Sequence, residues 1–205
     1  MFYDRPVPNE HKTANFTFRP LSPEYTELDY DAFMASKLEL RKWSNGNWPR
    51  DDFTLDENRA DLQRHYEEFQ TGKAYAYTVL NPQESRVEGC LYIDPLQRLV
   101  DRLEKRHGAT RDLTTVVKPT DVKPDEVHLC FWIRSDRLED EALLFREVYK
   151  WLQDAWRFPQ VSYGVYHTNP RQAALFESLG MHPRFRMVRD TDTLFSFYVE
   201  RPANG

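Results

Sequence analysis

The sequence predicts an α/β protein with a mixed central β-sheet and helices on both faces of that sheet. Short runs typical of strands recur along the chain between amphipathic stretches with helical spacing. One run, Val127–Ile133, is apolar on both faces, which is typical of a central strand. The chain has 205 residues, of which 40% are hydrophobic, and this is enough to bury a sizeable core.

The first half of the chain is predicted to run strand, helix, helix, strand, strand. After a loose polar arm over residues 1–15, the predicted elements are a strand over 16–21, helices over about 28–40 and 57–70, and a hairpin of strands over 74–80 and 86–93. In the second helix, Leu62, Tyr66 and Phe69 are spaced three and four residues apart, so they share one face. Asp56 is its expected N-cap.

Residues 96–125 interrupt this pattern and are predicted to be an insertion or a long ordered loop. Apolar residues with helical spacing run from Leu96 to Leu103, and Gly108, Pro119 and Pro124 then break the pattern. A segment of this length suggests either a function or mobility. It contains no aromatic side chain on which a nucleotide base could stack.

The second half is predicted to alternate strands with helices and to close with two strands. The expected elements are a strand over 127–133, a helix from Leu138 to Trp156, a strand over 161–166, a helix from Pro170 to Leu179, and strands near 185–188 and 193–199. Asp136 is the expected cap of the first helix. Asn169 is expected to cap the second helix, which Gly180 ends.

The chain from Val127 onward resembles the GNAT N-acetyltransferase superfamily. The run Phe131–Arg134, with the turn and helix that follow, is similar to the strand and helix that hold acyl-coenzyme A in this family. The stretch from Tyr163 to Met181 is similar to the family's late strand, asparagine-started helix and leucine-glycine stop. The resemblance implies the GNAT acyl-CoA acyltransferase fold in one domain over residues 16–200, with an insertion at about 96–125 and a tail over 201–205.

The resemblance also implies acetyl-CoA, or another acyl-CoA, as cofactor. In the family, two neighbouring strands splay apart, and the pantetheine arm of the coenzyme pairs with one of them like an added strand. The coenzyme's pyrophosphate then binds N–H groups at the start of the next helix. The cofactor-binding residues implied in this way are Phe131, Trp132, Ile133, Arg134, Arg137, Ala142, Asn169 and Phe176.

Two positions depart from the family's pattern. Arg137 and Ala142 fit its phosphate-binding turn, but Asp140 stands where the family has a glycine, and a glutamate lies on either side of it. Phe176 stands where many members have a tyrosine that protonates the departing thiolate. Two functions therefore stay open: an acyltransferase acting on a primary amine, and a non-catalytic GNAT-fold protein that binds another ligand or partner.

Acyl transfer to an amine needs a group or a water chain that takes up the amine proton. Glu126 and His128 share one face at the start of the central strand and are the predicted bases. The alternative for His128 is a structural, hydrogen-bonded residue. Tyr92 and Asp94, at the end of the preceding strand, are further candidates.

Four aromatic residues are predicted to bind the acceptor, which is a small molecule or an amino group of a larger one. They are Trp43, Trp48, Tyr75 and Tyr77. Two tryptophans in one loop are costly to expose, so they either pack into the core or line an acceptor site. Alternating tyrosines on a strand are also typical of a plain core.

Composition excludes several classes of protein. The formal net charge of -5 disfavours a nucleic-acid binder. No apolar stretch approaches the roughly 20 residues that span a bilayer, and the N-terminus lacks the apolar core of a secretion signal, so we expect a soluble, cytoplasmic protein. Cys90 and Cys130 show no zinc-ligand spacing, so no metal is expected. Ser135 and Ser162 lack a nucleophile elbow, which argues against a hydrolase, and a homodimer stays open.

Overall fold

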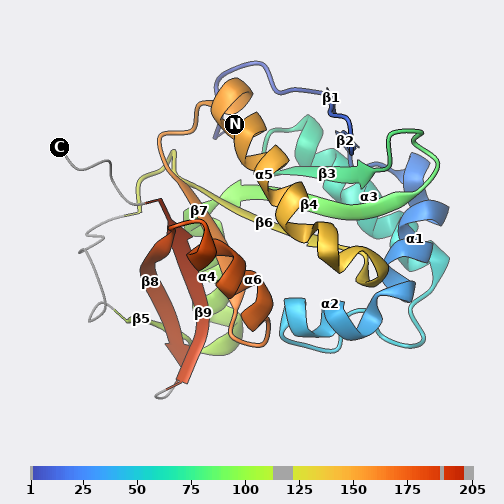
Figure 1. The fold of residues 1–205 in the computed structure, drawn as a ribbon. Coiled ribbons are helices and arrows are strands. Elements are labelled where there is room, and N and C mark those ends of the chain that lie inside the picture. The colour runs from blue at the N-terminus through green and yellow to red at the C-terminus, as the bar shows by residue number, and fades with distance from the viewer. Residues whose placement is uncertain (1, 113–121, 190–191, 201–205) are drawn as a thin grey trace. The chain divides into compact units, whose positions relative to one another are not determined.

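The computed structural model describes residues 2–112, 122–189 and 192–200, and Figure 1 shows the path of the chain. The chain forms two compact units, Met1–Ile93 with Phe131–Phe158 (unit 1) and 94–130 with 159–205 (unit 2). Strands β4 (Val87–Pro95) and β6 (Val127–Ile133) each begin in one unit and end in the other. Among the described residues, the strand order is β1-β2-β3-β4-β6-β7-β9-β8-β5.

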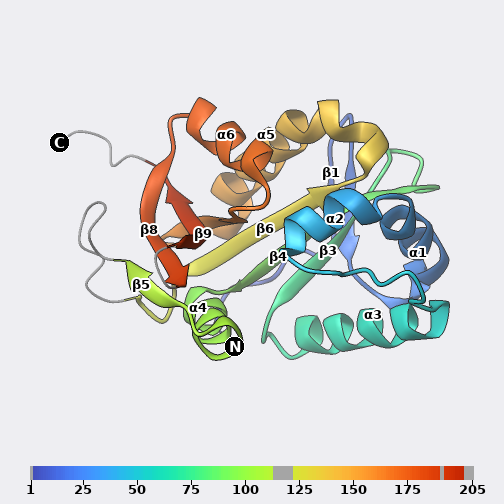
Figure 2. The same ribbon diagram turned by 90° about the horizontal axis from the view of Figure 1, so that it is seen from below.

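Unit 1 is a sheet covered by helices on both faces. Its other elements are β1 (His11–Lys12), β2 (Thr17–Pro20), α1 (Thr26–Ala35), α2 (Lys37–Ser44), α3 (Leu55–Gln70), β3 (Tyr75–Leu80) and α5 (Glu141–Trp151). Strands β1 to β4 pair antiparallel in chain order. Figure 2 shows α3 on one side of these strands and α5 on the other.

Successive side chains of β3 point to opposite faces of the sheet, so the strand contributes to the core on both faces of unit 1. Ala76 and Leu80 pack with Phe33, Leu62 and other residues of the helices α1 to α3. Tyr77 lies on the opposite side of the strand, because successive side chains point to opposite faces. Its ring contacts those of Trp151, the last residue of α5, and Trp156, in the π-helical turn that follows. Both faces of β3 are thus buried, as every one of its residues is.

Unit 2 also has a helix on each face of its strands. Its elements are α4 (Leu96–His107), β5 (Thr110–Asp112), β7 (Val161–Tyr166), α6 (Pro170–Ser178), β8 (His182–Arg189) and β9 (Asp192–Val199), with the start of β6. Leu96, Leu99, Val100 and Leu103 of α4 pack on Phe185 and other apolar residues of β8 and β9. The first part of the predicted insertion is therefore a core helix. Residues 113–121 of that insertion lie outside the described residues.

Three helix predictions, one of a helix's extent and two of N-caps, differ from the structure. The stretch 28–40 forms two helices, because the chain leaves helical geometry at Ser36 (φ -110°, ψ 14°). Helix α3 is capped by Thr54 and not by Asp56, since Thr54 and Glu57 form a capping box. Asp136 does not cap α5, because Ser135–Asp140 forms a 3₁₀ segment and the α-helix begins at Glu141.

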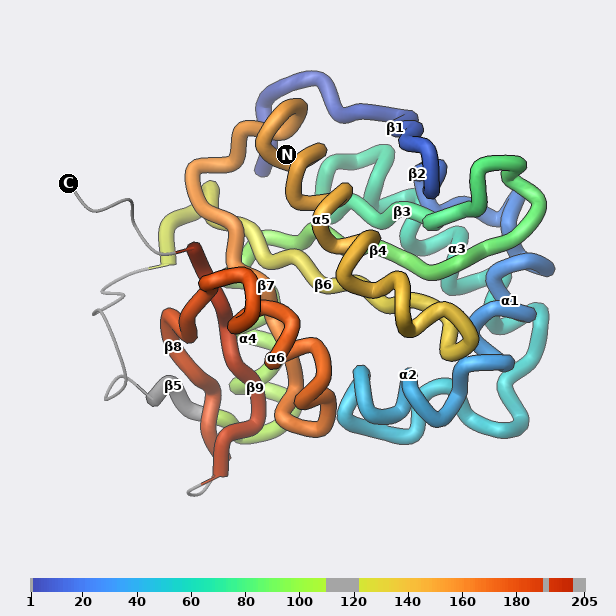
Figure 3. Tube along the Cα trace, in the orientation of Figure 1, coloured from blue at the N-terminus to red at the C-terminus, as the bar shows by residue number. Residues whose placement is uncertain are grey.

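The N-terminal segment, expected to be a loose arm, packs against the rest of unit 1. Tyr3 is buried, and its hydroxyl donates a hydrogen bond to the carbonyl of Trp156. The hydroxyl of Tyr77 donates to the carbonyl of Pro8 at 2.7 Å. Figure 3 shows this segment beside the end of the helix that contains α5. Within the described part of the chain, no helix has the length and apolar character needed to cross a bilayer.

Candidate functional site

The edge of β6 that faces away from β4 is the first feature of the candidate site. The Arg134 N–H donates to the carbonyl of Glu88 on β4 at 2.7 Å. Because backbone groups alternate along a strand, the amide groups of Phe131 point away from β4. There the carbonyl of Phe131 accepts a hydrogen bond from the Trp43 indole N–H at 2.7 Å. A side chain from α2 thus reaches the edge of β6 at Phe131.

In unit 2, the start of β6 pairs in parallel with β7. The paired residues are Val127 with Val161, His128 with Ser162, and Leu129 with Tyr163. On its other side, β7 pairs antiparallel with β9 from Tyr163 to Tyr166. The β6–β7 ladder therefore covers the first three residues of a seven-residue strand.

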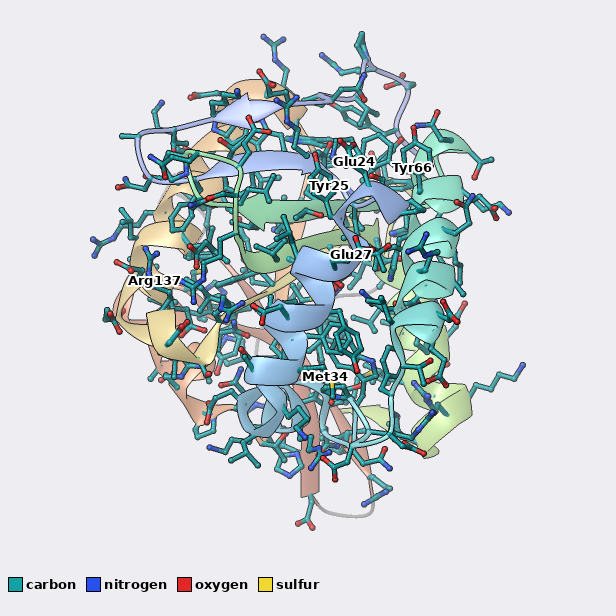
Figure 4. All side chains as sticks on the ribbon, turned by 90° about the vertical axis from the view of Figure 1, so that its right-hand side faces the viewer. Glu24, Tyr25, Glu27, Met34, Tyr66 and Arg137 are labelled. Atoms are coloured by element: carbon teal, nitrogen blue, oxygen red, sulfur yellow. The ribbon has the colours of Figure 1, made fainter. Side chains whose placement is uncertain are left out.

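The start of α5, where the resemblance implies a phosphate-binding turn, is rich in paired charges. Arg137 lies in the 3₁₀ segment with non-helical backbone angles (φ -130°, ψ 22°) and is labelled in Figure 4. Its guanidinium donates to Asp140 at 2.6 Å and to Glu88 at 3.3 Å. The hydrogen bond to Asp140 raises the pKa of Arg137. Arg134, in turn, donates to Asp31 at 2.8 Å.

Carboxylates outnumber arginines in this network. Glu88 is buried and accepts from Arg86 at 3.3 Å, and Arg86 also pairs with Asp136. Arg86, Arg134 and Arg137 therefore face four carboxylates, those of Asp31, Glu88, Asp136 and Asp140. An incoming phosphate would have to exchange with at least one of these carboxylates to reach a guanidinium.

The structure brings three of the predicted tryptophans together on the α1–α3 face of unit 1. Trp43 and Trp48 are half-buried, with ring centroids 6.5 Å apart, and both pack against a core cluster that contains Trp132. The Trp43 ring lies 6.0 Å from the ring of Tyr92. The Trp132 indole N–H donates to the Tyr92 hydroxyl at 3.4 Å. Predicted coenzyme and acceptor residues thus meet around Tyr92.

Tyr75 and Tyr77 lie elsewhere. Both are fully buried, and both contact Phe69 and Trp156, on the opposite face of β3 from the tryptophan cluster. Burial raises the pKa of each phenol. The structure does not bring these two tyrosines to Trp43 and Trp48.

The two predicted bases are buried in unit 2. The Glu126 carboxylate accepts two hydrogen bonds from the guanidinium of Arg184, at 2.9 and 3.2 Å. The His128 ring contacts the rings of Phe195 and Phe197, and its centroid is 5.9 Å from each of theirs. Burial lowers the pKa of His128 to about 3, with a smaller contribution from Arg102, so its imidazole is neutral at neutral pH. A catalytic role for either residue stays a prediction.

The absence of a side chain at Gly164 leaves space for the imidazole of His128 in the core of unit 2. A Cβ atom at this glycine would lie 2.2 Å from Nε2 of His128 and 2.5 Å from the ring of Phe195. No side chain can be accommodated there without movement of its neighbours. Within the described residues, Nε2 of His128 is a buried atom with no hydrogen-bond partner.

The last two predicted cofactor residues also belong to unit 2. Helix α6 begins at Pro170 as predicted, but the Asn169 side chain does not cap it; its amide donates to Gln172 at 3.3 Å instead. Phe176 is buried, and its ring packs against those of Tyr163 and Tyr198, at 5.8 and 5.5 Å. It has the surroundings of a core residue. Ala142, in unit 1, is half-buried in the first turn of α5.

Sequence reasoning missed a buried polar group beside the tryptophan cluster. Asp29 on α1 is only 4% exposed. Its carboxylate accepts from the Asn58 amide at 3.1 Å and from the Cys90 thiol at 3.4 Å. Burial raises the pKa of Asp29 to about 6. The sequence does contain a signal for this burial. Asp29 precedes Phe33 by four residues, so the two side chains lie on the same face of the helix.

No candidate metal centre accompanies these groups. In the ranges that the structure describes, no three His, Cys, Asp or Glu side chains are placed to hold an ion together.

Comparison with known proteins supports the fold through structure and not through sequence. No protein-family model matches the chain, and no curated protein matches it. Among solved structures, it is similar to the ribosomal-protein-S5-alanine acetyltransferase from Vibrio fischeri (12% identity, TM-score 0.63), covering 93% of this chain and 96% of that one. It is also similar to a microcin C7 self-immunity acetyltransferase in complex with acetyl-CoA and AMP (10% identity, TM-score 0.64), with 94% and 96% covered.

A third similar structure names the fold family directly. It is a putative GNAT-family acetyltransferase from Bordetella pertussis, with 13% identity, a TM-score of 0.56, and 95% and 100% of the two chains covered. Identities this low carry information about the fold alone. The predicted fold class is confirmed: this chain has the fold of the GNAT acetyltransferases.

Proposed function

We propose that this protein is an N-acetyltransferase that uses acetyl-CoA, or another acyl-CoA, and transfers the acyl group to a primary amine. The outer edge of β6 carries the proposal. Its ladder with β7 covers residues 127–129, and two residues further the carbonyl of Phe131 accepts from the Trp43 side chain. An extended ligand with amide groups can pair with such an edge as an added strand does. The acetyl-CoA complex of the microcin C7 acetyltransferase supports the choice of ligand.

In this proposal, the coenzyme arm lies beside Phe131 and Ile133 on the outer edge of β6. Trp132 and Arg134 hold the strand in place, through hydrogen bonds to Tyr92 and to Asp31. Bound acetyl-CoA supplies the acetyl group as a thioester. The amine of the acceptor is itself the nucleophile, so no covalent enzyme intermediate is needed.

The phosphate end of the coenzyme is the less favourable part of the fit. The resemblance assigns the turn before α5 to the phosphates of the coenzyme. Arg137 lies in this turn, and its guanidinium is paired with Asp140. A phosphate that takes the place of Asp140 must separate this ion pair. We therefore expect weaker coenzyme binding than a glycine at position 140 would permit.

The acceptor is proposed to be an amino group next to the aromatic cluster of Trp43, Trp48 and Tyr92. Aromatic faces attract ammonium groups, and the cluster lies beside Trp132 on β6. The name of the Vibrio fischeri protein, an acetyltransferase for alanine of a ribosomal protein, supports an amino group of a protein as acceptor. We accordingly place peptides with a free α-amino group first in a substrate screen.

Thermal unfolding in the presence of acetyl-CoA tests the proposal. A ligand selective for the folded state, at 100 times its Kd, stabilises that state by about 2.7 kcal/mol. For a chain of this length, Tm should rise by about 5–10 °C. AMP is the matched control, because it lacks the arm that pairs with β6, and it should shift Tm less. Acetyl transfer is then measured by mass spectrometry on peptides that begin with alanine or serine.

A second candidate function is a non-catalytic GNAT-fold binding protein. The Arg137–Asp140 ion pair and the lack of a hydroxyl at Phe176 favour it. Thermal unfolding with acetyl-CoA distinguishes the two candidate functions. If millimolar acetyl-CoA leaves Tm unchanged, the acetyltransferase proposal fails and the binding protein becomes the better account.

A further inference from the structure

We propose that Arg86 and Arg137, which share the buried carboxylate of Glu88, form a two-arginine clamp for the phosphates of the coenzyme. This inference rests on the proposed function and deepens it, since it assigns the phosphate end of the coenzyme to side chains of two separate segments. Arg86 directly precedes β4, whereas Arg137 lies in the turn before α5. All three residues belong to unit 1.

Glu88 on β4 brings the two guanidiniums together. Its Oε2 accepts a hydrogen bond from Arg86 and its Oε1 accepts one from Arg137, each at 3.3 Å. One carboxylate thus faces both arginines, so their guanidiniums are neighbours although they come from different segments. The backbone of Glu88 is held as well, because its carbonyl accepts from the Arg134 N–H, just after β6, at 2.7 Å.

The carboxylates around the two arginines differ in burial. The side chain of Glu88 is 2% exposed, whereas those of Asp136 and Asp140 are 57% and 28% exposed. A buried carboxylate that loses its cationic partners stays uncompensated, but an exposed one regains contact with water. Exposed ion pairs accordingly contribute little to stability. An incoming anion therefore exchanges with Asp136 and Asp140 and leaves Glu88 paired.

Each arginine uses one nitrogen for Glu88 and another for an exposed carboxylate. Arg86 donates through Nη1 to Glu88 and through Nη2 to Asp136. Arg137 donates through Nη1 to Glu88 and through Nε to Asp140, the latter at 2.6 Å. When the two aspartates turn to solvent, Nη2 of Arg86 and Nε of Arg137 become available. A guanidinium held in this way presents its donors in a fixed fork that matches phosphate oxygens.

The charge balance favours a phosphate once this exchange has occurred. With both aspartates in place, three carboxylates face the two guanidiniums of Arg86 and Arg137. Without them, only Glu88 remains and the sum of charges is positive. The neighbouring Arg134 keeps a partner of its own, Asp31, at 2.8 Å. A diphosphate has two phosphoryl groups, so each can meet one guanidinium of the clamp.

The turn that carries Arg137 is held in place by contacts that do not involve its aspartates. The backbone N–H of Ser135 donates to the hydroxyl of Ser36 at 3.0 Å. The N–H of Arg137 donates to the carbonyl of Arg134, also at 3.0 Å. Figure 4 shows Arg137 on this turn. The aspartate side chains can therefore rotate away while the backbone of the turn stays where it is.

Calorimetry with two ligands tests the clamp. The ligands are acetyl-CoA and S-acetylpantetheine, which has the same thioester arm without the phosphates and the adenosine. We expect Arg86→Gln to weaken acetyl-CoA binding about tenfold, because a hydrogen bond to a charged group is lost, and to leave the Kd of S-acetylpantetheine within twofold of the parent value. Arg59→Gln is the matched control. It removes the same charge from α3, where Arg59 pairs with Glu27 at 3.3 Å, and should change neither Kd.

Asp136→Asn tests the exchange of carboxylate for phosphate. It removes the exposed partner of Arg86 and keeps Glu88 paired, so acetyl-CoA should bind about threefold more tightly. The Kd of S-acetylpantetheine should again be unchanged. A purely structural ion-pair network would not improve the binding of one ligand and spare the other. Unchanged or weaker acetyl-CoA binding by Asp136→Asn would overturn the clamp, and this variant decides if Arg86→Gln does not fold.

The clamp and the proposed function fail separately. Equal acetyl-CoA Kd values in the parent protein and Arg86→Gln would overturn the clamp and leave the acetyltransferase standing. An equal loss of affinity for S-acetylpantetheine would also overturn it, because the substitution would then act on the arm. If the parent protein binds no acetyl-CoA, the proposed function fails and inorganic pyrophosphate decides on the clamp. A rise in Tm with pyrophosphate that Arg86→Gln abolishes would support the clamp, and no rise would refute it.

Discussion

Arg137 and Asp140 show how one residue can change a binding turn. The two side chains are 2.6 Å apart and each is about one-third exposed, so their ion pair is worth about 1 kcal/mol at most. A phosphate that approaches the start of α5 competes with this pair. The carboxylate also adds negative charge at the positive end of a helix dipole.

Asp140→Asn should therefore tighten acetyl-CoA binding about fivefold, because it removes one of the two ion pairs of Arg137 and one negative charge. Calorimetric Kd values at two salt concentrations measure this, and the salt dependence should become steeper. Glu139→Gln is the matched control, since it removes the same charge from the same turn and leaves the Arg137–Asp140 pair in place. Equal effects of the two substitutions would mean that the ion pair is irrelevant to the ligand.

Gly164 and His128 lie in close contact in the core of unit 2. We expect Gly164→Ala to lower the free energy of unfolding by about 1–3 kcal/mol, because the new methyl group would overlap the imidazole of His128 and the ring of Phe195. Urea denaturation measures the loss. In the double variant with His128→Ala, the imidazole is gone, so the combined loss should be smaller than the sum. Strict additivity would argue against the close approach.

At the scale of elements, the helix boundaries follow hydrogen bonds and not only sequence spacing. Helix α3 begins where Thr54 and Glu57 exchange hydrogen bonds between side chain and backbone, at 3.2 and 2.8 Å. Asp56 lies inside the first turn of that helix. It can interact with the helix dipole, but it cannot cap the helix.

Thr54→Ala should lower the free energy of unfolding by about 1 kcal/mol, because the Glu57 N–H loses its partner. Asp56→Ala, the matched control in the same turn, should cost no more than about 0.5 kcal/mol, the contribution of a charge near a helix end. Chemical denaturation of the two variants side by side distinguishes them. A larger loss of unfolding free energy in Asp56→Ala than in Thr54→Ala would indicate that Asp56 is the cap.

At the scale of the whole molecule, two buried groups give its stability opposite dependences on pH. The pKa of His128 is about 3 in the folded state, below its ordinary value of 6.5, so the unfolded chain binds the proton first. Stability from this group is lost as pH falls from 6.5 toward 3. The pKa of Asp29 is about 6, above its ordinary 3.8, so its contribution is full below 3.8 and is lost as pH rises through 6.

Asp29→Asn should separate these effects. In the parent protein, the term from Asp29 favours folding by about 1.4 kcal/mol more for each pH unit from 6 down to 4. The variant lacks this term. The difference in unfolding free energy between the two proteins should therefore shift in favour of the parent as the pH is lowered over this range. Urea denaturation from pH 4 to 8 measures it, and a difference that does not vary with pH would show that Asp29 has an ordinary pKa.

The sequence by itself determined the fold class and most of the strands. Val127–Ile133 and Val161–Tyr166 have the predicted boundaries, because the apolar run of a central strand is a local property of the chain. Helix α6 likewise begins at Pro170 as predicted, and Gly180 follows it with a positive φ of 79°. Such signals lie within a few residues of the structure that they specify.

Only the tertiary structure decided which polar side chains meet. Glu126 meets Arg184 across 58 residues, and Cys90 meets Asp29 across 61. Spacing along the chain records which face of an element is buried, but not which element covers that face. Glu126 is thereby paired with a guanidinium, whereas burial raises the pKa of Asp29, whose partners are a thiol and an amide. The chemistry of each group therefore depends on its partner, and the partner is set by the packing of distant segments.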